Sequence, residues 1–216
     1  MLKIGFLASG RGSNFQAIVD AINEGRIKAE ATILISDKPD AHALERARKH
    51  QIEAKFMDPA SHGNSDSYYE AIAMEMRSRE VGLVVLAGFM RIVRKPLLDA
   101  YNMKVMNIHP ALLPSFPGLH GHRDALDYGV KISGCTVHFV DEGMDTGPVI
   151  IQAAVPVYDD DTEDALSGRI LRLEHSIFPE AIRLFAEGSL EVQGRRVRVM
   201  GQRRIDDFIA NPPVSI

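Results

Sequence analysis

Two side chains able to stabilise a developing negative charge lie two positions apart in the segment KVMNIHP, which ends at Pro110. In an extended chain, residues i and i+2 project from the same face, so Asn107 and His109 are expected to point the same way. Proline cannot donate to a strand ladder, and the strand is therefore expected to end at His109. Because open α/β sheets bind ligands at the carboxyl ends of their strands, we predict that this amide and imidazole face a ligand.

A carboxylate that could join the pair is Asp145, which lies between Gly143 and Gly147 in the loop that separates two apolar runs. A carboxylate beside His109 favours the imidazolium form. An imidazolium next to an amide N–H can receive the negative charge that develops on a carbonyl oxygen under attack. The carboxylate could also take a proton from an attacking amine. With no serine or cysteine nucleophile evident nearby, the pattern favours direct transfer between two bound substrates, although a strand-capping Asn107 and a structural His109 remain alternatives.

The loop ASGRGSN follows the first apolar run and precedes the first helical pattern, where unpaired backbone N–H groups attract an anion. Gly12 allows close approach of a ligand to the backbone, and Ser13 and Asn14 are good N-cap types with donor groups. Phe15 occupies the place of the third glycine of a dinucleotide fingerprint, and the Gly-Lys-Ser/Thr ending of a P-loop is absent. We predict a phosphate monoester site here. A plain tight turn, or a dinucleotide site that uses Asp37, remains an alternative.

Short β-rich runs alternate with segments of helical period through the first hundred residues. The expected strands are 2–8, 31–36, 54–58 and 82–88, and the expected helices are 13–25, 40–51, 65–80 and 94–102. This alternation predicts an α/β fold with a mostly parallel central sheet and helices on both faces.

The second half is expected to add strands and one long helix. The expected strands are 104–109, 134–140 and 147–157, with a short helix at 122–129. A helix from about Thr162 to Glu187 contains Pro179, which should bend or restart it. The end reads as a hairpin turning at Gln193-Gly194, followed by a loose tail.

Composition narrows the class of protein. The chain has 216 residues, a net charge of −4 and a single cysteine, Cys135. One domain, small-molecule partners and a reducing cytoplasmic location are therefore expected, without nucleic acid or membrane binding. The first apolar run is too short for a signal peptide, and no run reaches the roughly 18 apolar residues of a membrane span. His120 and His122 lack an evident third ligand, so no metal site is predicted.

Several of these segments together resemble the glycinamide ribonucleotide formyltransferase family, the folate-dependent enzymes of purine synthesis. They are ASGRGSNFQAI, LAGFMRIV, NIHPALLPSFPGLHGHRDAL, TVHFVDEGMDTGPVI and LRLEH, in the same order over nearly the whole chain. The resemblance implies a three-layer, Rossmann-like formyltransferase fold in a single domain of residues 1–216. Within it, residues 1–100 would form the phosphate-binding half, 101–200 the catalytic and folate-binding half, and 201–216 a C-terminal tail.

The resemblance also implies roles for individual residues. The catalytic trio would be Asn107, His109 and Asp145. The ribonucleotide's phosphate and ribose, with its reacting amine, would be held by Gly12, Ser13, Asn14, Gly88 and Glu174. The folate would be held by Met90, Arg91, Ile92, Val93, Asn107, Val140, Asp141, Met144 and Asp145. The cosubstrate would be 10-formyltetrahydrofolate and the acceptor glycinamide ribonucleotide, with no metal, in a monomer or homodimer.

Some positions depart from the commonest family pattern. Ala111 stands where serine is common, and Gly143-Met144 replaces a more usual pair. Some members carry an arginine near Asp66 that this chain lacks. The Leu113-Pro114 bond is a candidate for the cis isomer. A formyltetrahydrofolate hydrolase and a noncatalytic nucleotide-binding module remain as rivals, while a methionyl-tRNA formyltransferase would need a further domain.

Overall fold

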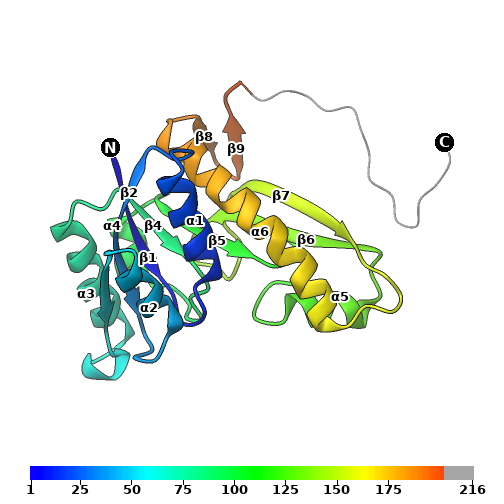
Figure 1. Ribbon diagram of the computed structural model, residues 1–216, viewed down its shortest axis with the longest axis horizontal. Coiled ribbons are helices and arrows are strands. Elements are labelled where there is room, and N and C mark those ends of the chain that lie inside the picture. The colour runs from blue at the N-terminus through cyan, green and yellow to red at the C-terminus, as the bar shows by residue number, and fades with distance from the viewer. Residues whose placement is uncertain (202–216) are drawn as a thin grey trace.

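The computed structural model describes residues 1–201, and the predicted alternation of strands and helices is confirmed in the first hundred residues (Figure 1). The elements are β1 Leu2–Leu7, α1 Ser13–Asn23, β2 Ala29–Ser36, α2 His42–Lys49, β3 Glu53–Phe56, the 3₁₀ turn η1 Pro59–Ser61, α3 Ser65–Ser78, β4 Leu83–Leu86 and α4 Lys95–Ala100.

The second half adds β5 Val105–His109, α5 Gly121–Tyr128, β6 Ile132–Phe139, β7 Val149–Pro156, α6 Glu163–Ala186, β8 Leu190–Gln193 and β9 Arg196–Val199. Each predicted strand and helix is present here as well. The predicted tail, apart from Gly201, lies outside the described residues.

One sheet contains the nine strands of the described residues, in the order β3-β2-β1-β4-β5-β6-β7-β9-β8. The strands from β3 to β5 pair in parallel, which confirms the mostly parallel sheet. Antiparallel pairing begins at β6, which runs against both β5 and β7. As a result, Asn107 of β5 lies directly opposite His138 of β6.

Two buried apolar clusters cover the two faces of the sheet, as the α/β pattern requires. Helices α1 and α6 lie together on one face of the sheet (Figure 1). There the rings of Phe6 and Phe15 meet edge to face at 4.9 Å between their centres. Helices α3 and α4 cover the other face. Along β5, Met106 and Ile108 enter the first cluster, which leaves Asn107 and His109 on the opposite side of the strand.

Helix α6 begins at a side-chain cap. The hydroxyl of Thr162 accepts a hydrogen bond from the Ala165 amide at 3.2 Å, which satisfies one of the free donors of the first turn. Pro179 is buried within one continuous helix, so the expectation that the helix restarts there is wrong. Phe178 and Ile182 both pack into the core beside the proline, and this packing holds the helix together where a hydrogen bond is lost.

The turn of the last hairpin also differs from the prediction. The β8–β9 hairpin pairs Gln193 with Arg196, so its turn is Gly194-Arg195, one residue later than predicted. Gly194 has a φ of 58°, a backbone conformation that favours glycine.

None of the helices within residues 1–201 has the length and apolar character needed to cross a bilayer.

We predict that Thr162→Ala lowers the free energy of unfolding by about 1 kcal/mol, because it removes the α6 cap. Urea denaturation measures this. Ser176→Ala is the matched control, since Ser176 is an exposed residue of the same helix whose hydroxyl only bonds back to the Arg172 carbonyl. Its effect should stay within about 0.5 kcal/mol. Equal effects of the two substitutions would contradict a capping role.

Candidate active site

A cleft of about 350 Å³ opens beside β4 and β5, under the loops that follow β4 and β6. It brings together the predicted catalytic trio and the whole predicted folate-binding set. These lining residues are Met90, Arg91, Ile92, Val93, Asn107, His109, Val140, Asp141, Met144 and Asp145, with Gly88. The side chains of Met90, Ile92 and Met144 are exposed, which gives the cleft an apolar mouth.

His109 is buried, and both of its ring nitrogens face oxygen atoms. Nε2 lies 2.7 Å from the carbonyl oxygen of Phe116, which can only accept, so Nε2 carries a proton. Nδ1 lies 3.4 Å from Oδ2 of Asp145, a contact longer than a formed hydrogen bond. Nδ1 is therefore the ring nitrogen that faces the Asp145 carboxylate, while Nε2 is held by the Phe116 carbonyl.

Asp145 is held in a strained backbone conformation. Its φ is 54°, in the left-handed region, and its Oδ2 also accepts a hydrogen bond from the Gly118 amide at 2.8 Å. The loop around it is tightly packed, because a Cβ on Gly147 would lie 1.7 Å from the Phe139 carbonyl oxygen. The Asp141 carboxylate holds the same loop by accepting from the Thr146 hydroxyl at 2.6 Å. The loop thus fixes the carboxylate against His109.

Asn107 is oriented by a second histidine. Nδ1 of His138 lies 2.8 Å from the Phe139 carbonyl oxygen and donates to it. Nε2 of His138 is then an acceptor, and the Asn107 amide nitrogen donates to it at 3.2 Å. Burial lowers the pKa of His138, in agreement with this neutral form. One N–H of Asn107 is thereby used, and the other remains for a ligand.

His138 is a buried residue, and both of its ring nitrogens are hydrogen-bonded. Its place in the cleft was missed, as were the Phe116 carbonyl and the Gly118 amide. No sequence signal identifies backbone groups of this kind. The signal for His138 is its register opposite Asn107, which requires the antiparallel pairing of β5 with β6.

The glycine-rich loop lies at the start of α1. Gly12, with a φ of 69°, is the N-cap. Ser13 and Asn14, although both are good N-cap types, lie within the first turn of the helix. The Asn14 amide instead donates to the Glu174 carboxylate of α6 at 2.8 Å. Burial raises the pKa of Glu174, against the effect of this hydrogen bond. Of the predicted ribonucleotide set, Gly12, Ser13, Asn14 and Glu174 therefore lie together outside the cleft lining, whereas Gly88 lines the cleft.

Hydrogen bonds join the glycine-rich loop to the cleft. The Ser9 amide donates to the Gly88 carbonyl at 3.0 Å, and the Met90 amide donates to the Ser9 hydroxyl at 2.9 Å. Asp37, the alternative acid of a dinucleotide site, is buried with Oδ2 4.0 Å from the Arg91 guanidinium. Its carboxylate is therefore placed to balance the charge of Arg91.

The chain between Pro110 and Gly118 is anchored by Thr136. The Thr136 hydroxyl donates to the Ala111 carbonyl at 2.7 Å and accepts from the Leu113 amide at 3.0 Å. Ala111 is fully buried, and the Leu113-Pro114 bond is cis, as anticipated. Asp66, the third departure from the family pattern, is exposed in the first turn of α3.

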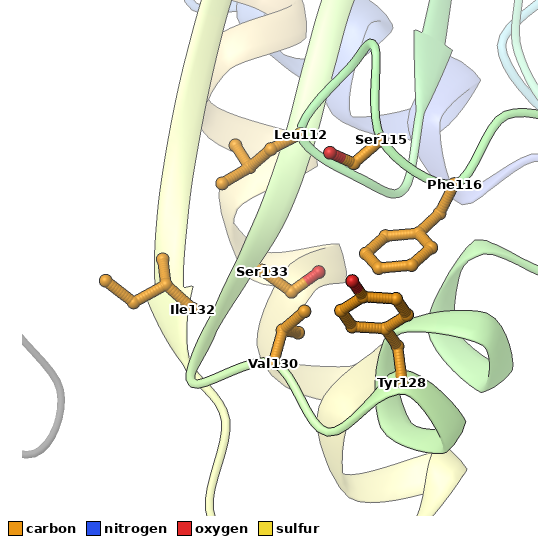
Figure 2. Close-up of a pocket in the computed structure, with 7 residues that line it drawn as sticks. All are labelled: Leu112, Ser115, Phe116, Tyr128, Val130, Ile132 and Ser133. Carbon is orange, nitrogen blue, oxygen red and sulfur yellow. The ribbon is translucent and has the colours of Figure 1, made fainter.

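A second cavity, of about 370 Å³, lies behind this loop (Figure 2). Figure 2 shows Phe116 and Tyr128 close together on one side of it, with the Ser133 hydroxyl directed between them. Apart from the Tyr128 phenol, its lining carries no ionisable group. The groups able to move protons are in the first cleft. Among residues 1–201, no cluster of three or more His, Cys, Asp or Glu side chains is arranged to hold a metal ion.

Comparison with known proteins agrees with this geometry. Residues 2–182 match the family described as formyl transferase. The chain belongs to the formyl transferase family. Its predicted family resemblance is thereby confirmed.

Related members of this family cover nearly the whole chain. The phosphoribosylglycinamide formyltransferase of Bacillus subtilis (strain 168) is 45% identical over 183 residues, 85% of this chain and 94% of that protein. The Escherichia coli (strain K12) protein of the same name is 41% identical over 202 residues, 94% and 95% of the two chains. The crystal structure of glycinamide ribonucleotide transformylase 1 from Symbiobacterium toebii superposes with a TM-score of 0.91 at 53% identity, covering 92% and 94%. The predicted α/β fold is confirmed.

We predict that Glu174→Gln raises the melting temperature of the ligand-free protein at pH 8. Because burial raises the pKa of Glu174, the folded state binds more protons than the unfolded state between the two pKa values. Stability is therefore fully present below the unfolded pKa and falls as pH rises through the folded pKa. Glutamine keeps the acceptor for Asn14 without the buried charge.

Calorimetry from pH 4 to pH 8 measures the effect. The difference between Glu174→Gln and wild type should disappear toward pH 4, where the carboxyl is protonated in both states. Glu70→Gln, at an exposed position of α3, is the control and should show no such trend. A Glu174→Gln protein that is less stable than wild type at pH 8 would show that the ionised carboxylate is favourable.

Proposed function

We propose that this chain transfers the formyl group of 10-formyltetrahydrofolate to the amine of glycinamide ribonucleotide. The products are formylglycinamide ribonucleotide and tetrahydrofolate, in de novo purine (IMP) biosynthesis. The observation that carries the proposal is one cleft in which His109 Nδ1 lies 3.4 Å from the Asp145 carboxylate, with Asn107 beside it on the same strand. The names of the relatives, and their similarity over the full chain, support it.

The reaction needs no covalent enzyme intermediate. The substrate amine attacks the formyl carbon, a C–N bond forms, and the formyl oxygen becomes an oxyanion. The free N–H of Asn107 and Nδ1–H of His109 donate to that oxygen. Asp145 takes a proton from the attacking amine. The bond between the formyl carbon and the folate nitrogen then breaks, and this nitrogen takes the proton from Asp145 to give tetrahydrofolate, which restores the carboxylate.

The folate is assigned to the apolar part of the cleft. The segment Met90 to Val93 offers backbone groups and apolar side chains to the pterin, and the Tyr69 hydroxyl fixes that segment by donating to the Ile92 carbonyl at 2.9 Å. Val140, Asp141 and Met144 would cover it from the other side. This assignment makes the strained Asp145 loop part of both the folate site and the catalytic site.

The ribonucleotide is assigned to the other end of the site. Its phosphate would bind the loop Gly12–Asn14, its ribose hydroxyls Glu174, and its amine would reach the cleft near Gly88. In this scheme residues 1–100 supply the phosphate-binding half and 101–200 the catalytic and folate-binding half of a single domain. We also propose a cytoplasmic location and a monomer or homodimer.

We predict that His109→Ala and Asn107→Ala each reduce turnover by about 100-fold or more, because removal of one oxyanion donor costs about 3–4 kcal/mol of transition-state stabilisation. Asp145→Asn should be impaired as severely, since the amide cannot accept the proton. Absorbance-monitored formyl transfer measures each rate. His42→Ala, at an exposed position of α2, is the control and should keep full activity.

The same assay distinguishes this reaction from its rivals. Without glycinamide ribonucleotide, a transferase leaves 10-formyltetrahydrofolate intact, whereas a hydrolase deformylates it. A noncatalytic nucleotide-binding module would show no turnover under either condition. Wild-type rates in the three cleft variants would remove the proposed roles of these side chains.

A further inference from the structure

Helix α2 holds the glycine-rich loop through two consecutive carbonyl groups. The Ala43 amide donates to the Gly10 carbonyl at 3.1 Å. The Arg46 guanidinium donates through Nε to the Arg11 carbonyl at 2.9 Å. A Cβ on Gly12 would lie 2.8 Å from the Ala43 Cβ, so the loop is pressed against this helix.

These two bonds fix the direction of the loop amides. In a trans peptide unit the C=O and the N–H point in opposite directions. Because the Gly10 and Arg11 carbonyls face α2, the N–H groups of Arg11 and Gly12 point away from it. Successive N–H groups directed to one side form a concave site for an anion, next to the positive end of α1.

Arg46 also ties the loop to the first turns of α1. Its Nη1 donates to the Gln16 side-chain oxygen at 3.2 Å. The Gln16 amide in turn lies 2.8 Å from Asp20 and 2.8 Å from His50. A guanidinium can donate hydrogen bonds to the Arg11 carbonyl and to Gln16 at the same time, because its donors have a fixed planar geometry that the lysine ammonium lacks.

A buried polar atom next to the loop also points to a ligand. The Asn14 side chain is 8% exposed, and its Oδ1 has no hydrogen-bond partner within the described part of the chain. Its amide nitrogen is committed to Glu174, so the oxygen is left to accept from a ligand hydroxyl.

We propose that Arg46 is a positioning residue for the phosphate of the ribonucleotide substrate, an inference that rests on the proposed function for the identity of that substrate. Arg46 acts through the Arg11 carbonyl. Without this bond the Arg11-Gly12 peptide can rotate and direct its carbonyl oxygen, a negative dipole end, at the phosphate. The residue thus controls ribonucleotide binding and leaves the formyl-transfer chemistry unchanged.

The test compares Arg46→Met, Arg46→Lys and Arg48→Met in steady-state formyl transfer. For Arg46→Met we expect KM for glycinamide ribonucleotide to rise about 10-fold, with kcat and KM for 10-formyltetrahydrofolate within about twofold of wild type. For Arg46→Lys, KM for glycinamide ribonucleotide should remain at least about fivefold above that of wild type. Arg48, exposed on the same helix, is the control for loss of one positive charge, and its variant should match wild type.

Binding of ribose 5-phosphate, measured by calorimetry, separates this inference from the proposed function. The Kd should rise about 10-fold in Arg46→Met whether or not the protein transfers formyl groups. Unchanged Kd and KM in Arg46→Met would overturn the proposal. Full recovery in Arg46→Lys would also overturn it, since charge alone would then suffice. If Arg46→Met fails to fold, the proposal is tested with Arg46→Lys, which keeps the charge and most of the side chain. The same two constants are measured, KM for glycinamide ribonucleotide and Kd for ribose 5-phosphate.

Discussion

The contact between Asp145 and His109 is the constraint on which the candidate active site depends. The two side chains are largely buried, and a carboxylate and an imidazole interact more strongly there than they would in solvent. The strained φ of Asp145, the Gly118 amide and the glycines with no room for a side chain all hold the carboxylate in place. The strain at Asp145 is offset by hydrogen bonds and packing elsewhere in the loop.

The buried histidines His109 and His138 lie close together but have different hydrogen-bonding partners. His138 donates to one backbone carbonyl and accepts from an amide, so the neutral ring satisfies its surroundings. His109 instead faces the Phe116 carbonyl through Nε2 and the Asp145 carboxylate through Nδ1. The difference arises from the partners of each ring nitrogen, since both residues are almost completely buried. Asn107 lies next to both rings and receives its orientation from the neutral one.

Much of this arrangement could be predicted from the sequence, because local patterns determine it. The alternation of apolar runs and helical segments predicts the parallel strands, and the i, i+2 spacing places Asn107 and His109 on one face of β5. The antiparallel direction of β6 depends on pairing between strands distant in the chain, so the register of Asn107 with His138 could not be foreseen. The same is true of backbone partners such as the Phe116 carbonyl.

Local rules also failed where tertiary packing outweighed them. Serine and asparagine favour helix caps, yet Gly12 takes that place because only a glycine fits against Ala43 with a positive φ. Asn14 is then free to bond across to α6. A proline inside α6 does not divide it, because buried side chains on both sides fix the helix against the sheet.

The hydrogen bond between Asn14 and Glu174 joins residues 160 positions apart in the chain. A ribosome must therefore have released most of the protein before the two ends of this pair can meet. Contacts of such long range form slowly, since a large loop has to close first. The proposed ribonucleotide site is therefore completed late in folding. A chain that has assembled only its amino-terminal strands has the glycine-rich loop but lacks the Glu174 carboxylate.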